Sequence, residues 1–331
     1  MRVLLAAALL LRASDAAYGC CDGPPTPEQT NPIGVQRIHK VTLAVANLTE
    51  TAAWWSGAFG FTAGAPFAAP SGTVQRLQLF DGGITIELLQ AHEPPRPAHV
   101  LPPPYNHTTT HGMISQFSFR VYDVDVALAI LATRGVPKAA PTFPNPLLQL
   151  YLGWVRDPTT GVLVELLQPF DKNASHVDPA QNPLGLLGFN QVTKCVANTT
   201  LTQAWHRTVL NTVLPYRFHV DLLAAFGTIV EIAQADSHFR VEAIYNATAV
   251  PLPAAARRPA YPLQASVVGV ASYAVSVAQD IHAARANVAA RALALGTAAP
   301  SEVYAPGGAW GPPSFFVEDA DGVLVEMVSL S

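Results

Sequence analysis

The chain has 331 residues, of which 50% are hydrophobic and only 13% are charged. A composition this apolar excludes an intrinsically disordered protein and leaves enough chain for two ordinary domains. The formal net charge is -4 and no long basic run occurs, so nucleic acid and anionic membrane surfaces are not expected as main partners.

The N-terminus has the pattern of a secretory leader. Arg2 precedes the apolar run Val3–Leu11, and small residues follow it; the run is too short to span a bilayer. We expect residues 1–19 to be removed and the mature protein to be secreted or to lie in the lumen of the secretory pathway. A short anchor and a buried first helix are the alternatives. No later stretch is apolar for about 18 residues, so no membrane attachment is expected after cleavage.

Two further features fit a secretory protein. Asn-X-Ser/Thr sequons predict N-glycosylation at five positions: Asn47, Asn106, Asn173, Asn198 and Asn246. Asn47 has a second reading, because Asn47 and Glu50 also form a helix-start capping pair. The three cysteines, Cys20, Cys21 and Cys195, are too few for a disulfide scaffold. One of the first two could bridge to Cys195, or Cys195 could be a buried thiol.

The predicted elements begin with a strand at Val41–Val45, followed by a helix that carries Trp54 and Trp55. Two strand-like runs, "VQRLQLF" and "ITIELLQ", come next and flank a turn. The segment "SQFSFRVYDVDVALAILATRGV" then starts the cycle again, with an Asp cap and with Gly135 as the helix stop. The runs "YLGWVRD" and "GVLVELLQ" complete it. The repeating unit is β-α-β-β-β.

The whole pattern is duplicated. Ile38–Phe59 aligns without gaps on Phe189–Leu210, with nine of 22 positions identical. The last strands of the two halves also match, and Glu165 and Glu326 take equivalent places. The chain therefore contains four β-α-β-β-β modules in two domains. The predicted boundaries are 33–170 for the first domain, 171–185 for a polar linker and 186–331 for the second domain.

The segments "IHKVTLAVANL", "AWWSGAFGF", "ITIELLQ", "FSFRVYDVDVALAILATRGV" and "RDPTTGVLVELLQP" resemble the vicinal oxygen chelate superfamily, which includes glyoxalase I, extradiol dioxygenases and bleomycin-resistance proteins. The resemblance implies an α+β fold in which paired modules form cupped, mixed β-sheets. It also implies a metal in each cup, bound by the residue before the valine of each first strand and by the central residue of each last strand.

In this chain the implied ligand positions contain no histidine. In the first half they are Lys40, Glu87, Gln116 and Glu165, and in the second half they are Gln191, Glu242, Ser272 and Glu326. A site with two histidines and one carboxylate cannot be built from either set, which argues against extradiol dioxygenase chemistry. The Lys40 ammonium would repel a cation and could neutralise two carboxylates in its place. The first set is therefore predicted to be metal-free.

The second set, Gln191, Glu242, Ser272 and Glu326, has oxygen donors only. Such donors suit Mg, Mn or Ca better than Zn or Fe, so the sequence allows one divalent metal there, or none. A polar lining without metal is the alternative. The pocket residues expected besides the ligand positions are Thr42, Thr193 and Cys195. His39 is expected to face away from the cup, because side chains alternate along a strand.

Three functions remain open. The first is a glyoxalase-like lyase or isomerase, or a dioxygenase-type enzyme, in which Glu165 or Glu326 removes a proton next to a carbonyl. The second is a metal-free module that binds a small molecule, and the third is a non-catalytic interaction protein. In the first two, the partner is a small oxygen-bearing molecule. The protein is expected to be a monomer or a homodimer.

Overall fold

A computed structural model describes twelve stretches of the chain. They are 33–69, 72–79, 83–92, 110–111, 113–145, 150–170, 182–219, 228–233, 240–245, 250–251, 269–304 and 311–330. The predicted leader, Cys20, Cys21 and residues 171–181 of the predicted linker lie outside these stretches, as do the sequons at Asn106, Asn173 and Asn246. Among the described residues no helix is both long and apolar enough to cross a membrane.

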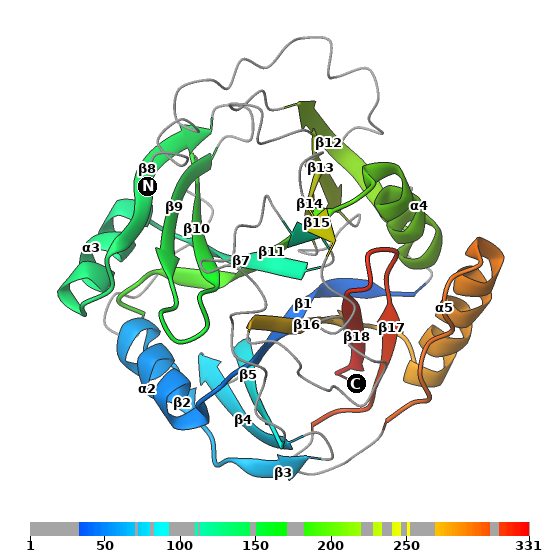
Figure 1. Ribbon diagram of the computed structural model, residues 1–331, viewed down its shortest axis with the longest axis horizontal. Coiled ribbons are helices and arrows are strands. Elements are labelled where there is room, and N and C mark those ends of the chain that lie inside the picture. Colours follow the sequence, from blue (N-terminus) through cyan, green and yellow to red (C-terminus); the bar gives the residue numbers. More distant parts are fainter. Residues whose placement is uncertain are drawn as a thin grey trace.

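Four modules follow one another along the first and second halves, each opening with a strand and a helix (Figure 1). Module 1 comprises β1 (Val35–Ala44), α2 (Leu48–Phe59), β2 (Thr62–Ala63), β3 (Phe67–Ala69), β4 (Gly72–Leu79) and β5 (Ile84–Ala91). Module 2 comprises β7 (Met113–Val121), α3 (Val124–Thr133), β8 (Lys138–Asn145), β9 (Leu150–Arg156) and β10 (Leu163–Pro169).

The second half repeats this order. Module 3 comprises β11 (Leu186–Val196), α4 (Thr199–Leu210), β12 (Val213–His219), β13 (Thr228–Ala233) and β14 (Arg240–Tyr245). Module 4 comprises β16 (Gly269–Val277), α5 (Ile281–Leu295), β17 (Ser314–Glu318) and β18 (Leu324–Ser329). The short strands β6 (Thr110–His111) and β15 (Val250–Pro251) pair with each other. The predicted α+β fold of four modules is confirmed.

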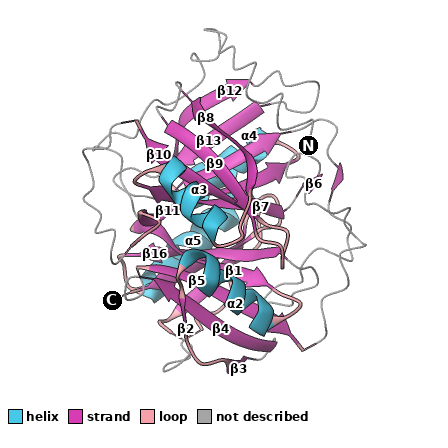
Figure 2. Cartoon of the chain, turned by 90° about the vertical axis from the view of Figure 1, so that its left-hand side faces the viewer, coloured by secondary structure: helices cyan, strands magenta, loops and turns pink. Residues whose placement is uncertain are grey.

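The modules pair crosswise. Strand β1 of module 1 lies antiparallel to β16 of module 4, and β7 of module 2 lies antiparallel to β11 of module 3. These strands form one 16-stranded sheet, in which β7 also pairs with β16. Cup A is its part β2-β4-β5-β1-β16-β18-β17, and cup B is its part β8-β9-β10-β7-β11-β14-β13-β12. Figure 2 shows cup B at the top and cup A below it. Each cup therefore combines residues from both halves of the chain.

Helix starts follow the predicted capping chemistry. The Asn47 side chain accepts a hydrogen bond from the backbone N–H of Glu50 at 3.2 Å, and the Asn47 amide donates to the Glu50 carboxylate at 3.3 Å. The equivalent Asn198 caps α4 in the same way through the N–H groups of Thr200 and Leu201. A side chain that satisfies these N–H groups stabilises the first turn, typically by about 1 kcal/mol.

Strand alternation divides each sheet into two faces. In β1 the side chains of Val41 and Leu43 join the large core beneath the helices, where Trp55 is fully buried. Lys40 and Thr42 face the other way, into cup A. The four helices lie on the two outer flanks, α2 with α3 on one side and α4 with α5 on the other (Figure 1). The faces of the sheets opposite the helices are thus the candidate sites.

A bulge interrupts this alternation at His39. Ile38 and Val41 both belong to the helix-side core, and the pairing with β16 shifts between Ile38 and Lys40. The expectation that His39 faces away from the cup, into the helix layer or solvent, rested on strict alternation, which the bulge breaks. Burial, and then the charge of Lys40, lowers the pKa of His39 to about 4.

Candidate functional site

A buried ion cluster occupies the centre of cup A. The Nζ atom of Lys40 lies 3.1 Å from both carboxylate oxygens of Glu87 and 3.0 Å from Oε2 of Glu326. The Nε atom of Arg76, on β4, lies 3.1 Å from Glu87 as well. These residues come from β1, β5, β18 and β4, and the Lys40 and Glu326 side chains are only 9% and 7% exposed. The cluster thus joins module 1 to module 4.

Electrostatics keeps this cluster ionised. Burial alone would lower the pKa of Lys40, but the negative charges of Glu326 and Glu87 outweigh it and raise that pKa above its usual value. Burial alone would raise the pKa of Glu87, but Lys40 and Arg76 outweigh it and lower that pKa. Two cations therefore face two carboxylates, and the formal charge of the cluster is balanced.

Apolar side chains line the same face of cup A. They form a cluster separate from the main core, with these buried members: Ala44, Ala69, Val74, Leu89, Ala271, Phe316 and Leu324. Strand register explains the arrangement, because Phe316 lies opposite Glu326 and Val74 lies opposite Leu89. Phe67 packs against this cluster and lies beneath the Arg76 guanidinium, 5.3 Å from the ring centre. Cup A therefore has a charged floor and an apolar wall.

Two hydroxyl groups complete the floor of cup A. Thr42 donates to Glu87 at 3.4 Å. Ser272 lies opposite Thr42 on β16 and is fully buried, and its Oγ has no hydrogen-bond partner among the described residues. Since buried hydroxyls are usually satisfied, Ser272 Oγ is a candidate contact for a bound molecule.

Cup B has a different centre, made of amides, carboxylates and a hydroxyl. The Gln116 amide donates to Glu165 at 3.4 Å and to the Thr193 hydroxyl at 3.0 Å. Gln191 also donates to Glu165, at 3.4 Å, while Thr193 donates to Glu242 at 2.8 Å. These residues lie on β7, β10, β11 and β14. Modules 2 and 3 therefore build cup B as modules 1 and 4 build cup A.

The structure regroups the residues predicted from the sequence. Ligand positions were grouped by half of the chain, but each half contributes one pair to each cup. Lys40, Glu87, Ser272 and Glu326 belong to cup A, whereas Gln116, Glu165, Gln191 and Glu242 belong to cup B. The grouping of Gln191, Glu242, Ser272 and Glu326 as one metal site was wrong, because β11 and β14 carry the first two residues in cup B, whereas β16 and β18 carry the last two in cup A.

The donor chemistry of the two cups differs in its fit to a divalent metal. In cup A the Lys40 ammonium lies between the two carboxylates, so the residues present do not fit a second cation there. In cup B the amide N–H groups of Gln116 and Gln191 point at Glu165, and Thr193 donates to Glu242. The carboxylate and amide oxygens of these side chains are hard donors of the kind that Mg or Mn prefers. No group of three or more His, Cys, Asp or Glu residues suited to a metal occurs within the described stretches.

Some contributors were missed at the sequence level. Arg76 and Phe316 lie on β4 and β17, beside the strands that carry the ligand positions, and only strand pairing reveals them. Cys195 is buried on β11 opposite Met113; its possible partners Cys20 and Cys21 lie outside the described residues, so a disulfide stays a prediction. His206 is fully buried.

Comparison with known proteins agrees with this geometry. Residues 37–166 match the family model of the Glyoxalase/Bleomycin resistance protein/Dioxygenase superfamily. Glyoxalase I from Zea mays is similar in structure, with a TM-score of 0.57 at 16% identity, over 89% of this chain and 92% of that chain. A putative dioxygenase from Bacillus subtilis gives a TM-score of 0.59 at 14% identity, over 89% of this chain and 85% of that chain.

No curated protein sequence matches the chain significantly. At these identities the structural likeness shows the fold, with its paired modules and cupped sheets. The family match covers modules 1 and 2, which contain half of the residues of each cup. The resemblance predicted from the sequence is therefore confirmed by the match of residues 37–166 to the Glyoxalase/Bleomycin resistance protein/Dioxygenase superfamily.

Proposed function

We propose that cup A binds a small molecule without a divalent metal. The observation that carries this proposal is the position of Lys40 Nζ, at 3.1 Å from Glu87 and 3.0 Å from Glu326. The ammonium supplies the positive charge that two buried carboxylates need. It also supplies N–H donors, which a bare metal would lack.

The lining of cup A indicates the kind of molecule. The floor is charge-balanced, and the wall is apolar, including Leu89, Phe316 and Leu324. A site with few polar groups and an apolar wall suits a small, largely apolar molecule. An oxygen atom on that molecule would accept a hydrogen bond from the Lys40 ammonium or from the Ser272 hydroxyl. A strongly anionic ligand is less suited, because Glu87 and Glu326 already neutralise the cations.

A metal-binding experiment tests the role of Lys40. Equilibrium dialysis with Mn²⁺ and Zn²⁺ is done on the wild type and on Lys40→His, which replaces the ammonium by a metal ligand. We expect Lys40→His to bind one more divalent ion per chain than the wild type, and the gain to disappear when Glu326→Gln is added. Absence of any gain in a folded Lys40→His variant would contradict the proposed substitution of a metal by Lys40.

A ligand screen tests binding in cup A. Thermal shifts are measured with a panel of small aromatic and aliphatic ketones, aldehydes and lactones. Leu324→Gln alters the wall of cup A, and Leu163→Gln is the matched control, because Leu163 takes the equivalent place in the last strand of module 2 in cup B. Stabilisation by a compound that Leu324→Gln abolishes and Leu163→Gln retains supports the proposal. Compounds that respond in the opposite way would place the binding in cup B.

A second function is favoured by the donors of cup B. Gln116 and Gln191 both approach Glu165 at 3.4 Å, and Thr193 links this group to Glu242. The four ligand positions of cup B would hold a hard divalent cation such as Mn²⁺ through their side-chain oxygens, and the bound cation would polarise a substrate carbonyl. These positions are Gln116, Glu165, Gln191 and Glu242. Glu165 would then remove the neighbouring proton. Glu326 is the weaker candidate for a base, because its carboxylate is ion-paired with Lys40.

Variants in the two cups separate these functions. Mn²⁺ binding by the wild type should be lost in Glu165→Gln and retained in Glu326→Gln. Turnover of a hemithioacetal or a related α-hydroxycarbonyl compound should follow the same pattern. If Mn²⁺ binding survives both Glu165→Gln and Glu242→Gln, cup B is not the metal site.

The leader-like segment also supports a proposal on location. We propose that the protein enters the secretory pathway, because Arg2 and the apolar run Val3–Leu11 have the pattern of a signal peptide. A reporter fused after residue 32 should be exported from eukaryotic cells with the leader removed. Retention of the reporter in the cytosol would contradict this proposal, with no effect on the proposals for the cups.

A further inference from the structure

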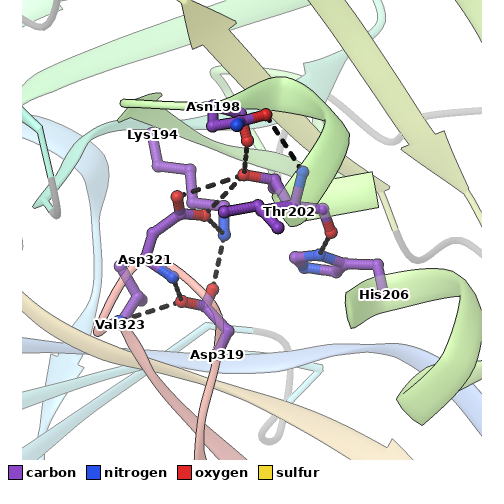
Figure 3. A network of polar contacts seen from close by, with 8 residues as sticks. Lys194, Asn198, Thr202, His206, Asp319, Asp321 and Val323 are labelled. Carbon is purple, nitrogen blue, oxygen red and sulfur yellow. Dashed lines mark hydrogen bonds and ion pairs between the residues drawn. The ribbon is translucent and has the colours of Figure 1, made fainter. Parts of the chain in front are cut away.

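A second buried ionic cluster lies outside both cups, between modules 3 and 4 (Figure 3). Lys194 follows Thr193 on β11 and so points to the opposite face, toward α4. Its Nζ lies 2.5 Å from Oδ2 of Asp319 and 2.7 Å from Oδ2 of Asp321. The Lys194 and Asp319 side chains are 0% exposed, and the Asp321 side chain is 7% exposed. An amine and a carboxyl group are therefore held together in the absence of bulk water.

The Asp319 carboxyl group has the surroundings of an acyl group prepared for attack. Its Oδ1 accepts hydrogen bonds from two backbone N–H groups, those of Asp321 at 2.9 Å and Val323 at 3.0 Å. Its Oδ2 faces the Lys194 amine. Two N–H donors on one oxygen stabilise the negative charge that develops there when a nucleophile adds to the carbon. This orientation leaves Oδ2 as the oxygen that can depart.

Asp321 is placed to move the protons. One of its oxygens lies 2.7 Å from Lys194 Nζ, and Thr202 of α4 donates to the same carboxylate at 2.9 Å. Next to it, His206 contacts the backbone oxygen of Thr202 through Nδ1 at 2.8 Å. Burial, and then the charge of Lys194, lowers the pKa of His206 to about 3. The histidine is therefore neutral and adds no competing cation.

We propose that Lys194 and Asp319 condense to an intramolecular isopeptide bond. A proton passes from the Lys194 ammonium to Oδ2 of Asp319, which leaves a neutral amine and a carboxylic acid. The amine nitrogen adds to Cγ of Asp319 while the Asp321 carboxylate accepts a proton from it. Asp321 returns that proton to the departing hydroxyl. A C–N bond forms, a C–O bond breaks, one water molecule leaves, and no electron is transferred to or from the site.

Burial supplies the driving force. Burial alone would lower the pKa of Lys194, but Asp319 and Asp321 outweigh it and raise that pKa, so the amine starts as an ammonium in an ion pair. Two buried charges carry a large desolvation cost. The amide product is neutral and keeps one oxygen in the two N–H bonds, so condensation removes that cost. The net charge of the cluster is -1 before and after the reaction, since one cation and one of two carboxylates disappear.

The first half of the chain contains a natural control. Asp157 occupies the place of Asp319, but Leu43 occupies the place of Lys194 in the aligned repeat. Asp157 instead accepts hydrogen bonds from the Trp55 indole at 3.2 Å and from the Thr160 hydroxyl at 2.7 Å. Within the part of the chain that the structure describes, no amine contacts this carboxylate. The crosslink is thus confined to modules 3 and 4, where it joins β11 to the turn between β17 and β18.

Peptide mass spectrometry tests the bond. The full chain is produced in a bacterial host without N-glycosylation, denatured and digested with trypsin. We expect no cleavage after Lys194, and peptide 173–207 joined to peptide 292–331, with a mass equal to their sum minus one water. Recovery of peptides 173–194 and 292–331 as separate, linear species would overturn the proposal. A succinimide at Asp321–Gly322 also loses water, but on the linear peptide, and so counts against the crosslink.

Variants test the assigned roles. Asp321→Asn keeps the size of the side chain but removes the proton acceptor, and we expect separate peptides. Asp319→Asn should still crosslink but lose ammonia instead of water. Asp157→Asn, the matched control in module 2, should crosslink as the wild type does. A crosslink of unchanged yield in Asp321→Asn would contradict the role of Asp321, whereas the wild-type digest alone decides whether the bond exists.

Discussion

The centre of cup A holds an ammonium group, whereas the centre of cup B holds two carboxamides. Lys40 and Gln191 occupy aligned places in β1 and β11, and each approaches the glutamate of a last strand from the other half, Glu326 or Glu165. Gln191 in the place of Lys40 thus replaces an ion pair with the last-strand glutamate by a hydrogen bond from an uncharged amide. Equivalent backbones can therefore support two cups that differ in their need for a cation.

Removal of the Lys40 ammonium should cause the largest difference in stability between variants of the two cups. Lys40→Met leaves Glu87 and Glu326 buried with less positive charge, and loss of one partner from a buried pair typically costs about 3–5 kcal/mol of folding free energy. Gln116→Met in cup B removes only neutral donors, at about 1–2 kcal/mol. Urea unfolding at pH 7, followed by tryptophan fluorescence, measures both. Equal losses in the two variants would contradict the ionic character assigned to cup A.

A second difference lies at the bulges that precede the two central residues. His39 stands in module 1 where Asn190 stands in module 3, and only the histidine titrates. Its pKa is lowered from 6.5 to about 4 in the folded protein, so below pH 6.5 the unfolded chain binds a proton that the folded chain does not. Stability should therefore fall as pH decreases from 6.5 to about 4, by roughly 2–3 kcal/mol from this group.

The variant His39→Asn has at position 39 the residue type of Asn190 in module 3. It should lose the part of the pH dependence of stability that comes from His39. Unfolding free energies are measured from pH 7 to pH 4, and over this range the wild type should lose roughly 2–3 kcal/mol relative to the variant. The buried His206 contributes acid sensitivity to both proteins, so the difference between them isolates His39. A constant difference across the pH range would show that His39 does not stay neutral in the fold.

Local patterns explain why the fold could be predicted from the sequence. The alternation in Val41–Val45, the caps at Asn47 and Asn198, and the repeat itself depend on short segments, which specify strands and helices directly. The partner of β1 is not specified in this way. Strands β7 and β16 carry similar apolar patterns, and either would cover the same face, so the crosswise pairing needed the structure.

The site, like the fold, was predictable within each module but not between modules. Lys40 and Glu87 were paired correctly, because they belong to one module and the resemblance fixes their places. Glu326 was assigned to another cup, since its contact with Lys40 depends on the pairing of modules 1 and 4. The bulge at His39 did leave a sequence signal. Ile38 and Val41 are three residues apart, a spacing that a regular strand cannot place on one face.

The smallest expected effect concerns the hydroxyl groups beside each centre. Ser272 Oγ in cup A is buried without a partner among the described residues, so Ser272→Ala should leave stability unchanged or raise it by less than about 1 kcal/mol. Thr193 in cup B accepts from Gln116 and donates to Glu242, so Thr193→Val should cost about 1–2 kcal/mol. Urea unfolding of both variants gives the comparison. If Ser272→Ala costs as much stability as Thr193→Val, Ser272 Oγ is hydrogen-bonded in the free protein. The Ser272 hydroxyl is then not a candidate contact for a bound molecule.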